Sequence, residues 1–161
     1  MFCKGDKVVY PMYGAGVIED LEEKLIDGVS RIYYIMNIPV GNLKISVSAG
    51  NAEVLGLREI YSSNRVMSVL EKVSEIPVEM PENWNERYKC NLAKIKTGKL
   101  IEVVEVYRNL YLREKARGLS SVEKKLLSNA KQIVISEIVL AQNVGKEEAE
   151  DILFSYAIKW S

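Results

Sequence analysis

The 161-residue sequence contains no histidine, and this absence narrows the chemistry that the protein can perform. Histidine is the commonest general base and metal ligand in proteins. The only cysteines, Cys3 and Cys90, lie far apart and form neither a disulfide framework nor a metal-binding motif. We therefore expect no metal, no cofactor and a reducing compartment, with Cys90 as a small core residue of an amphipathic helix.

Long apolar runs are also missing. No stretch reaches the length of a transmembrane helix, and no charged-then-apolar leader precedes the first predicted strand, so we expect a cytoplasmic protein without membrane contact. No pair of a nucleophile and a base can be identified. The segment Gly14-Ala15-Gly16 lacks a third glycine in register for dinucleotide binding and precedes a strand. We predict that the protein is not an enzyme.

Net charge is zero, with 22 basic and 22 acidic residues, but the charge is segregated along the chain. Residues 80–135 hold twelve basic and six acidic residues, a net charge of +6, whereas 1–79 and 136–161 each carry −3. Scattered lysine and arginine usually mark a solvated helix surface. Their concentration in the middle of the chain modestly favours a surface that binds a polyanion.

The first 55 residues have the pattern of a small β-domain. Short runs rich in Val, Ile and Tyr predict strands at 7–10, 16–24, 31–38 and 43–47. Asp27-Gly28 is a strong signal for a hairpin turn, because both turn positions require positive φ. Short strands joined by tight turns predict a partly open barrel of the SH3 or Tudor kind over residues 1–55.

From residue 56 onward the apolar spacing becomes helical. Leu57, Ile60 and Val66 begin a predicted helix that runs to about 73, and the segment 76–82, with two prolines, reads as a linker. Further helices are predicted at 84–96, 100–117, 122–141 and 146–160. The short connections between them predict a compact all-α bundle over 56–161. The expected fold class is therefore α+β with two domains.

Trp84 is the most informative residue, because it begins a predicted helix. Asn83 is a good N-cap, and Glu86 completes a pair resembling a capping box. Arg87 and Lys89 follow, so an aromatic ring, free backbone N–H groups and two cations gather at one helix end, which suits phosphate binding. The alternative is that Trp84 packs in the core, since it shares a helical stripe with Tyr88 and Leu92. The residues alone leave both interpretations open.

A helix-turn-helix motif around Gly118 is a further alternative. The turn length is suitable, but the second helix, 122–141, is mostly apolar. A recognition helix needs several polar side chains that face the groove. The helix is better explained as the central core element of the bundle.

The chain resembles the CarD family of bacterial RNA polymerase-binding transcription factors, which includes the CdnL branch. The resemblance covers nearly the whole length, and a similar N-terminal module occurs in the transcription-repair coupling factor, a much longer ATPase. The helical part that contains Trp84 separates the two. The motifs that carry the resemblance are Gly5-Asp6-Lys7-Val8-Val9-Tyr10-Pro11, Tyr13-Gly14-Ala15-Gly16, Tyr33-Tyr34, Asn51-Ala52-Glu53, Gly56-Leu57-Arg58, Asn83-Trp84, Arg87-Tyr88-Lys89, Asn91-Leu92, Arg117-Gly118-Leu119-Ser120 and Glu123-Lys124.

The resemblance implies two binding surfaces. The N-terminal module is expected to bind the protrusion of the polymerase β subunit, partly by edge-strand pairing, through Lys24, Ile26 and Ser46. The helical module is expected to lie on promoter DNA at the upstream edge of the melted region. Its DNA-binding residues would be Trp84, as a wedge in the minor groove, with Arg87, Lys89 and Lys124 on the backbone. Ser46 and Glu86 depart from relatives that carry basic residues there.

The expected function is therefore that of a transcription factor that stabilises the open promoter complex with little base specificity. The alternative is a non-enzymatic protein–protein adaptor in which Trp84 anchors an interface. We expect a monomer. A domain-swapped dimer is the alternative, because a small barrel presents exposed strand edges.

Overall fold

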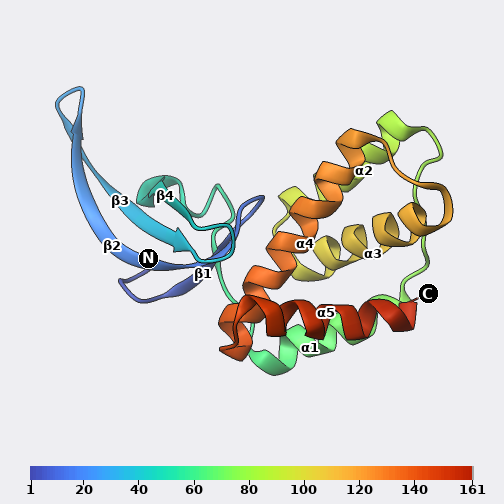
Figure 1. The fold of residues 1–161 in the computed structure, drawn as a ribbon. Coiled ribbons are helices and arrows are strands. Elements are labelled where there is room, and N and C mark those ends of the chain that lie inside the picture. Colours follow the sequence, from blue (N-terminus) through green and yellow to red (C-terminus); the bar gives the residue numbers. More distant parts are fainter. Residues whose placement is uncertain (161) are drawn as a thin grey trace.

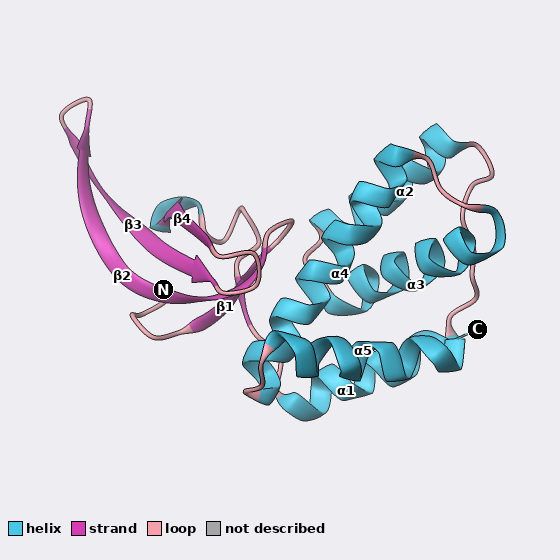
Figure 2. Ribbon diagram, viewed as in Figure 1, coloured by secondary structure: helices cyan, strands magenta, loops and turns pink. Residues whose placement is uncertain are grey.

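The computed structural model describes residues 1–160, in which an antiparallel sheet precedes a group of helices (Figures 1 and 2). The sheet has the strand order β4-β3-β2-β1-β5. Its strands are β1 (Lys7–Tyr10), β2 (Gly14–Ile26), β3 (Val29–Ile38), β4 (Leu43–Ser48) and β5 (Arg58–Glu59). This arrangement agrees with the predicted α+β class, while the Tudor-like barrel stays a prediction.

The β2–β3 hairpin is longer than the sequence predicted and projects from the sheet (Figure 1). It turns at Asp27 and Gly28, whose φ angles of 50° and 76° confirm the predicted tight turn. Within β2, only residues 14–17 pair with β1, and within β3, only residues 33–38 pair with β4. The outer part of the hairpin is therefore paired only with itself.

The segment 57–60 was predicted to be helical, and this prediction is wrong. Leu57 packs into the core of the sheet, and β5 pairs with β1 through Val8 and Val9. Helix α1 (Ser63–Lys72) begins only after Ser62, whose Oγ accepts a hydrogen bond from the Arg65 N–H at 3.3 Å. The apolar spacing of 57–60 also suits a short edge strand, and pairing with β1 satisfies its backbone. The domain boundary at 55/56 stays a prediction.

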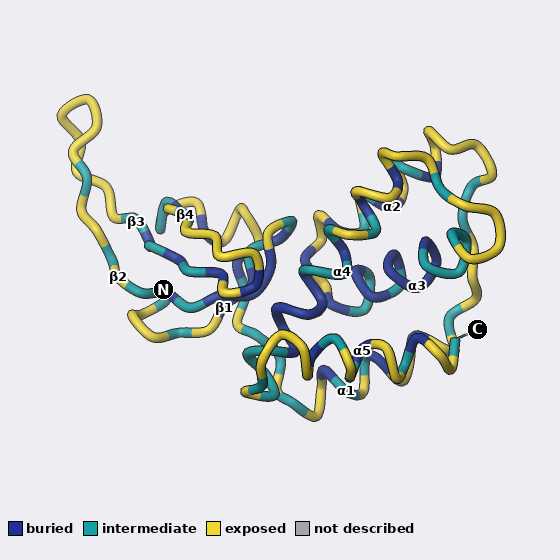
Figure 3. The backbone as a smooth tube through the Cα atoms, in the orientation of Figure 1, coloured by how far each residue is buried: buried dark blue, intermediate teal, exposed yellow. Residues whose placement is uncertain are grey.

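The remaining helices confirm the predicted positions closely. They are α2 (Trp84–Lys96), α3 (Leu100–Arg117), α4 (Ser121–Gln142) and α5 (Lys146–Trp160), with short 3-10 helices η1 (Ala49–Asn51) and η2 (Val73–Glu75). Helix α4 is buried over much of its length, as expected for the central element (Figure 3). Within residues 1–160, none of the helices combines the length and apolarity needed to cross a membrane.

The sheet and the helices meet at α4. The Ala15 N–H donates to Ser136 Oγ at 2.8 Å, in a buried position. A Cβ on Gly14 would lie only 2.7 Å from the same Oγ, so this close approach needs glycine. Next to it, the Glu137 carboxylate accepts two hydrogen bonds from the Arg58 guanidinium, at 2.8 and 2.9 Å, and one from the Tyr61 N–H at 2.9 Å. Hydrogen bonds with little exposure to solvent thus connect the two parts.

Candidate nucleic-acid interface

Trp84 is the first residue of α2, and 54% of its surface is exposed. The Asn83 side-chain Oδ1 accepts hydrogen bonds from the N–H groups of Asn85 and Glu86, at 3.0 and 3.2 Å. The predicted N-cap is therefore confirmed. The core interpretation of Trp84 is wrong, because the apolar stripe of α2 reaches the core only from Tyr88 onward.

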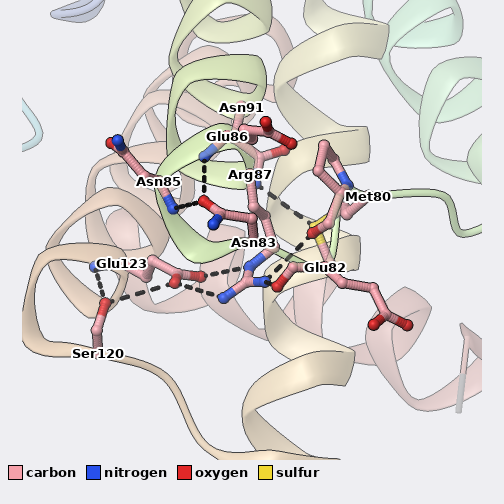
Figure 4. Close-up of polar contacts among 10 residues, drawn as sticks. Met80, Glu82, Asn83, Asn85, Glu86, Arg87, Asn91, Ser120 and Glu123 are labelled. Atoms are coloured by element: carbon pink, nitrogen blue, oxygen red, sulfur yellow. Dashed lines mark hydrogen bonds and ion pairs between the residues drawn. The ribbon is translucent and has the colours of Figure 1, made fainter.

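Arg87 does not lie where the sequence analysis expected it. Only 4% of it is exposed, and its guanidinium faces α4 instead of solvent (Figure 4). Nε and Nη2 donate to the two carboxylate oxygens of Glu123, at 2.9 and 2.7 Å. Nη1 donates to the carbonyls of Pro81 and Glu82, at 3.2 and 2.8 Å. The expected contact of Arg87 with a DNA phosphate is therefore not supported by its position.

Glu123 explains why sequence reasoning missed this pair. Glu123 stands three residues after Ser120, the spacing of a capping box, and the Glu123 N–H does donate to Ser120 Oγ at 3.3 Å. Its carboxylate, however, is buried and bonds mainly to Arg87, 36 residues earlier in the chain. Because a local capping motif already explains Glu123, nothing in the sequence indicates that it pairs with the distant Arg87.

Lys89 and Lys124 are exposed, as a surface that binds phosphates requires. The Arg87–Glu123 pair joins the first turns of α2 and α4, so both lysines and Trp84 lie at the same end of the helices. Figure 1 shows that this end is far from the sheet and also holds the end of α3. Lys115, Arg117 and Lys125 are exposed there too, and the sequence analysis did not assign them to the site. Because Glu123 balances Arg87, the positive charge of this end comes from these surface residues, and the exposed carboxylates of Glu82 and Glu86 oppose part of it.

The linker before Trp84 is fixed by a second buried arginine, Arg108 of α3. Its guanidinium donates to the carbonyls of Val73, Ile76 and Pro77, the latter two at 2.6 and 3.3 Å. Burial lowers the pKa of Arg108, and the nearby carboxylate of Glu105 acts in the opposite direction. Arg108 and Arg87 thus hold the two ends of the segment 76–82, because their guanidinium groups provide hydrogen-bond donors for carbonyls at each end.

The residues expected to contact polymerase lie on one face of the sheet. Alternation along β2 puts Lys24 and Ile26 on the same side, and the strand register adds Ser46 of β4 to it. Lys24 Nζ lies 3.2 Å from Ser46 Oγ and 4.9 Å from the centre of the Tyr33 ring. Ile26 is 44% exposed at the end of the hairpin. The structure therefore brings Lys24 and Ser46 into contact, with Ile26 beyond them.

Both cysteines are free thiols at the surface. Cys90 is exposed, which contradicts its predicted place in the core, because α2 turns Arg87, Asn91 and Ile95 inward instead. Cys3 is exposed as well. Among residues 1–160, no group of three or more His, Cys, Asp or Glu side chains is arranged to hold a metal ion.

Comparison with known proteins gives matches to both parts of the chain. Residues 2–61 match the CarD-like/TRCF RID domain, and residues 65–154 match the CarD C-terminal domain. A Bacillus subtilis (strain 168) protein named "Putative transcription factor YdeB" is 32% identical over 151 residues, which cover 92% of this chain and 97% of YdeB. Together these matches show that the chain belongs to the CarD family of transcription factors.

Proposed function

We propose that this protein binds the β subunit of RNA polymerase through its sheet and promoter DNA through its helices, and that it stabilises the open complex. Membership of a transcription factor family supports the general role. The observation that carries the DNA part is the exposed indole of Trp84, at a capped helix N-terminus and close to exposed lysines. In this role Trp84 enters the minor groove at the upstream edge of the melted DNA.

An apolar side chain that enters an opened base step exchanges contact with water for contact with bases. Trp84 suits this role, because its ring is large and Asn83 holds the backbone that carries it. Lys89 and Lys124 supply phosphate contacts at the same end of the helices, and such contacts carry little sequence information. The protein would therefore recognise opened DNA more than any base sequence.

The polymerase surface consists of Lys24, Ile26 and Ser46 on the outer face of the sheet. An exposed isoleucine beside a lysine suits an interface with an apolar centre and a polar rim. Binding to polymerase holds the helices close to the promoter and raises their effective concentration there. A chain of zero net charge can then act on DNA although its own affinity for DNA is weak.

Stabilisation follows from preferential binding to one state. A factor that binds open DNA better than closed DNA shifts the equilibrium toward the open complex. A difference of about 1.4 kcal/mol in binding free energy raises the ratio of open to closed complexes tenfold. Stacking of a base on an aromatic side chain contributes about 1–3 kcal/mol, so a single well-placed aromatic wedge is sufficient for an effect of this size.

The test measures open-complex lifetime with the cognate polymerase and without factor, with wild type or with Trp84→Ala. We expect wild type to lengthen the lifetime and Trp84→Ala to lose most of that effect while it retains its fold. The matched control is Trp160→Phe, since Trp160 packs edge-to-face on Tyr107 with ring centres 6.0 Å apart. That variant should behave as wild type. No lengthening by a folded, polymerase-bound wild type would contradict the proposal.

The alternative function is that of a protein–protein adaptor, in which the same exposed Trp84 anchors an interface with another protein. A DNA surface loses affinity steeply as salt rises, because bound phosphates release counterions. An interface between Trp84 and another protein loses far less affinity as salt rises. An effect of Trp84→Ala on protein capture that is insensitive to salt, together with unchanged open complexes, would favour the adaptor.

A further inference from the structure

We propose that Arg87 and Glu123 are positioning residues, which fix Trp84 in its exposed place and do not themselves touch DNA. This inference rests on the proposed function, because it concerns how Trp84 is presented to DNA. It differs from the expectation that Arg87 binds the DNA backbone.

All three nitrogens of the Arg87 guanidinium have partners within the protein (Figure 4). Two of them bond to Glu123 in the first turn of α4. The third bonds to the carbonyls of Pro81 and Glu82, at the end of the linker. One side chain therefore connects three segments: the start of α2, the linker before it and the start of α4.

The burial of the pair excludes the possibility that Arg87 both holds Glu123 and contacts a DNA phosphate. Arg87 is 4% exposed and Glu123 is 1% exposed, so neither charge faces solvent. If Arg87 moved out to a phosphate, Glu123 would remain buried without its partner, which is strongly unfavourable. The pair therefore stays closed when DNA binds.

Trp84 depends on this arrangement, because it is 54% exposed and surrounding groups cover less than half of its surface. Its direction is set by the backbone on both sides. On one side, Pro81 and Glu82 accept hydrogen bonds from Arg87, and on the other side Arg87 itself stands one helical turn later. Loosening the pair frees the backbone that aims the ring.

The direction in which one substitution changes the open-complex lifetime distinguishes a positioning role from an electrostatic one. Glu123→Gln removes a negative charge close to the surface that would face DNA. If charge alone mattered, this variant would bind DNA more strongly and lengthen the open-complex lifetime. If Glu123 positions Trp84, the same variant shortens the lifetime, although it makes the protein more positive.

The experiment compares Glu123→Gln, Arg87→Lys and Lys124→Gln in the full chain with polymerase and promoter. Arg87→Lys keeps the charge but loses the planar fork that bonds two oxygens at once. Lys124→Gln is the matched electrostatic variant, since Lys124 adjoins Glu123 and is exposed. The readouts are open-complex lifetime over a range of salt, thermal melting, and hydrogen exchange at the Asn85 and Glu86 amides, which Asn83 caps.

We expect Glu123→Gln and Arg87→Lys to shorten the lifetime by about tenfold, as the loss of charge-assisted hydrogen bonds implies. Exchange at the two amides should become faster, and the salt slope should stay that of wild type. Lys124→Gln should instead lower the slope by about one unit and leave amide exchange unchanged. If Arg87→Lys melts before the assay temperature, the milder Glu123→Gln, which keeps an acceptor oxygen, decides the question.

A lifetime for Glu123→Gln equal to or longer than that of wild type would overturn the inference. So would an Arg87→Lys variant with wild-type lifetime and exchange, because a cation without the fork would then suffice. If wild type itself fails to lengthen the lifetime, the proposed function is contradicted instead. If wild type lengthens the lifetime and Trp84→Ala does not, the proposed function stands, and the Glu123→Gln and Arg87→Lys variants decide the inference.

Discussion

Tyr107 is a buried phenol whose ionisation is opposed by its surroundings. It lies in the core of the helices, with ring centres 5.8 Å from Tyr111 and 6.0 Å from Trp160. Burial, and to a lesser degree Tyr111, raises the pKa of Tyr107 from 10.0 to about 12. The folded protein therefore keeps this proton at a pH where the unfolded chain loses it.

The sign of the effect on stability follows directly. The contribution of Tyr107 is fully present below pH 10, and it is lost as the pH rises toward 12, because ionisation favours the unfolded chain. The gap between 10.0 and about 12 corresponds to about 3 kcal/mol of unfolding free energy. Urea unfolding between pH 9 and 11 should show a smaller loss for Tyr107→Phe than for wild type. Tyr13→Phe, which removes an exposed phenol, should retain the wild-type loss.

At the residue scale, the sequence predicted the position of a residue within its helix better than it predicted whether the side chain is buried. The cap at Asn83 and the place of Trp84 in the first turn were predictable, because capping depends on residues close in the chain. The burial of Arg87 was not, since its partner Glu123 lies on another helix. Cys90 was predicted to be buried but is exposed, for a related reason. The inward face of α2 is set by Arg87, Asn91 and Ile95, two of which are polar.

The projecting β2–β3 hairpin presents different side chains on its two faces. Lys24 and Ile26 lie on the face that we propose to bind polymerase, whereas Leu25 lies on the opposite face and is 76% exposed. That opposite side continues into a hollow of about 800 Å³ lined in part by Phe2, Ile32 and Leu57. Neighbouring residues of one strand can therefore test which face binds.

We expect Ile26→Asp to weaken polymerase binding by about tenfold or more, because a carboxylate would replace an apolar contact at the interface. Leu25→Asp makes the same chemical change one residue earlier and should have little effect. Binding of the full chain to polymerase, measured for both variants and wild type, distinguishes them. If Leu25→Asp weakened binding and Ile26→Asp did not, the hollow face would be the interface instead.

At the scale of elements, turns and caps predicted most boundaries. Asp27-Gly28 located the hairpin, and the cap at Asn83 located the start of α2. The segment 57–60 failed because its apolar residues suit either a helix or a short strand. Pairing with β1 decides the matter, and β1 lies some fifty residues earlier in the chain. Non-local pairing of this kind leaves no mark within the segment.

The junction between sheet and helices depends on Ser136 in a way that can be isolated. Ser136 Oγ donates to the Ile133 carbonyl at 2.6 Å and accepts from the buried Ala15 N–H. Ser155 makes the same local bond, to Ile152 at 2.6 Å, but is exposed on α5. The two serines thus differ in the contact with the sheet.

Ser136→Ala should lower the free energy of unfolding by about 1–3 kcal/mol, because it leaves the Ala15 N–H buried without an acceptor. Ser155→Ala, measured by the same denaturant unfolding, should change stability by less than about 0.5 kcal/mol, as is usual for the surface. Hydrogen exchange at the Ala15 amide should accelerate only in the first variant. Equal effects of the two substitutions would show that the contact between sheet and helix contributes nothing beyond the local bond.

The buried bonds at Ser136 and Glu137 have a consequence for the whole molecule. They join the sheet and the helices into a bracket, with the projecting hairpin at one end and the start of α2, which carries Trp84, at the other. In the proposed function, such a bracket bound to polymerase would reach a single point along the promoter. Which base step meets the indole would then be set by distance from the enzyme and not by the base sequence of the DNA, so the protein would work as a gauge of length.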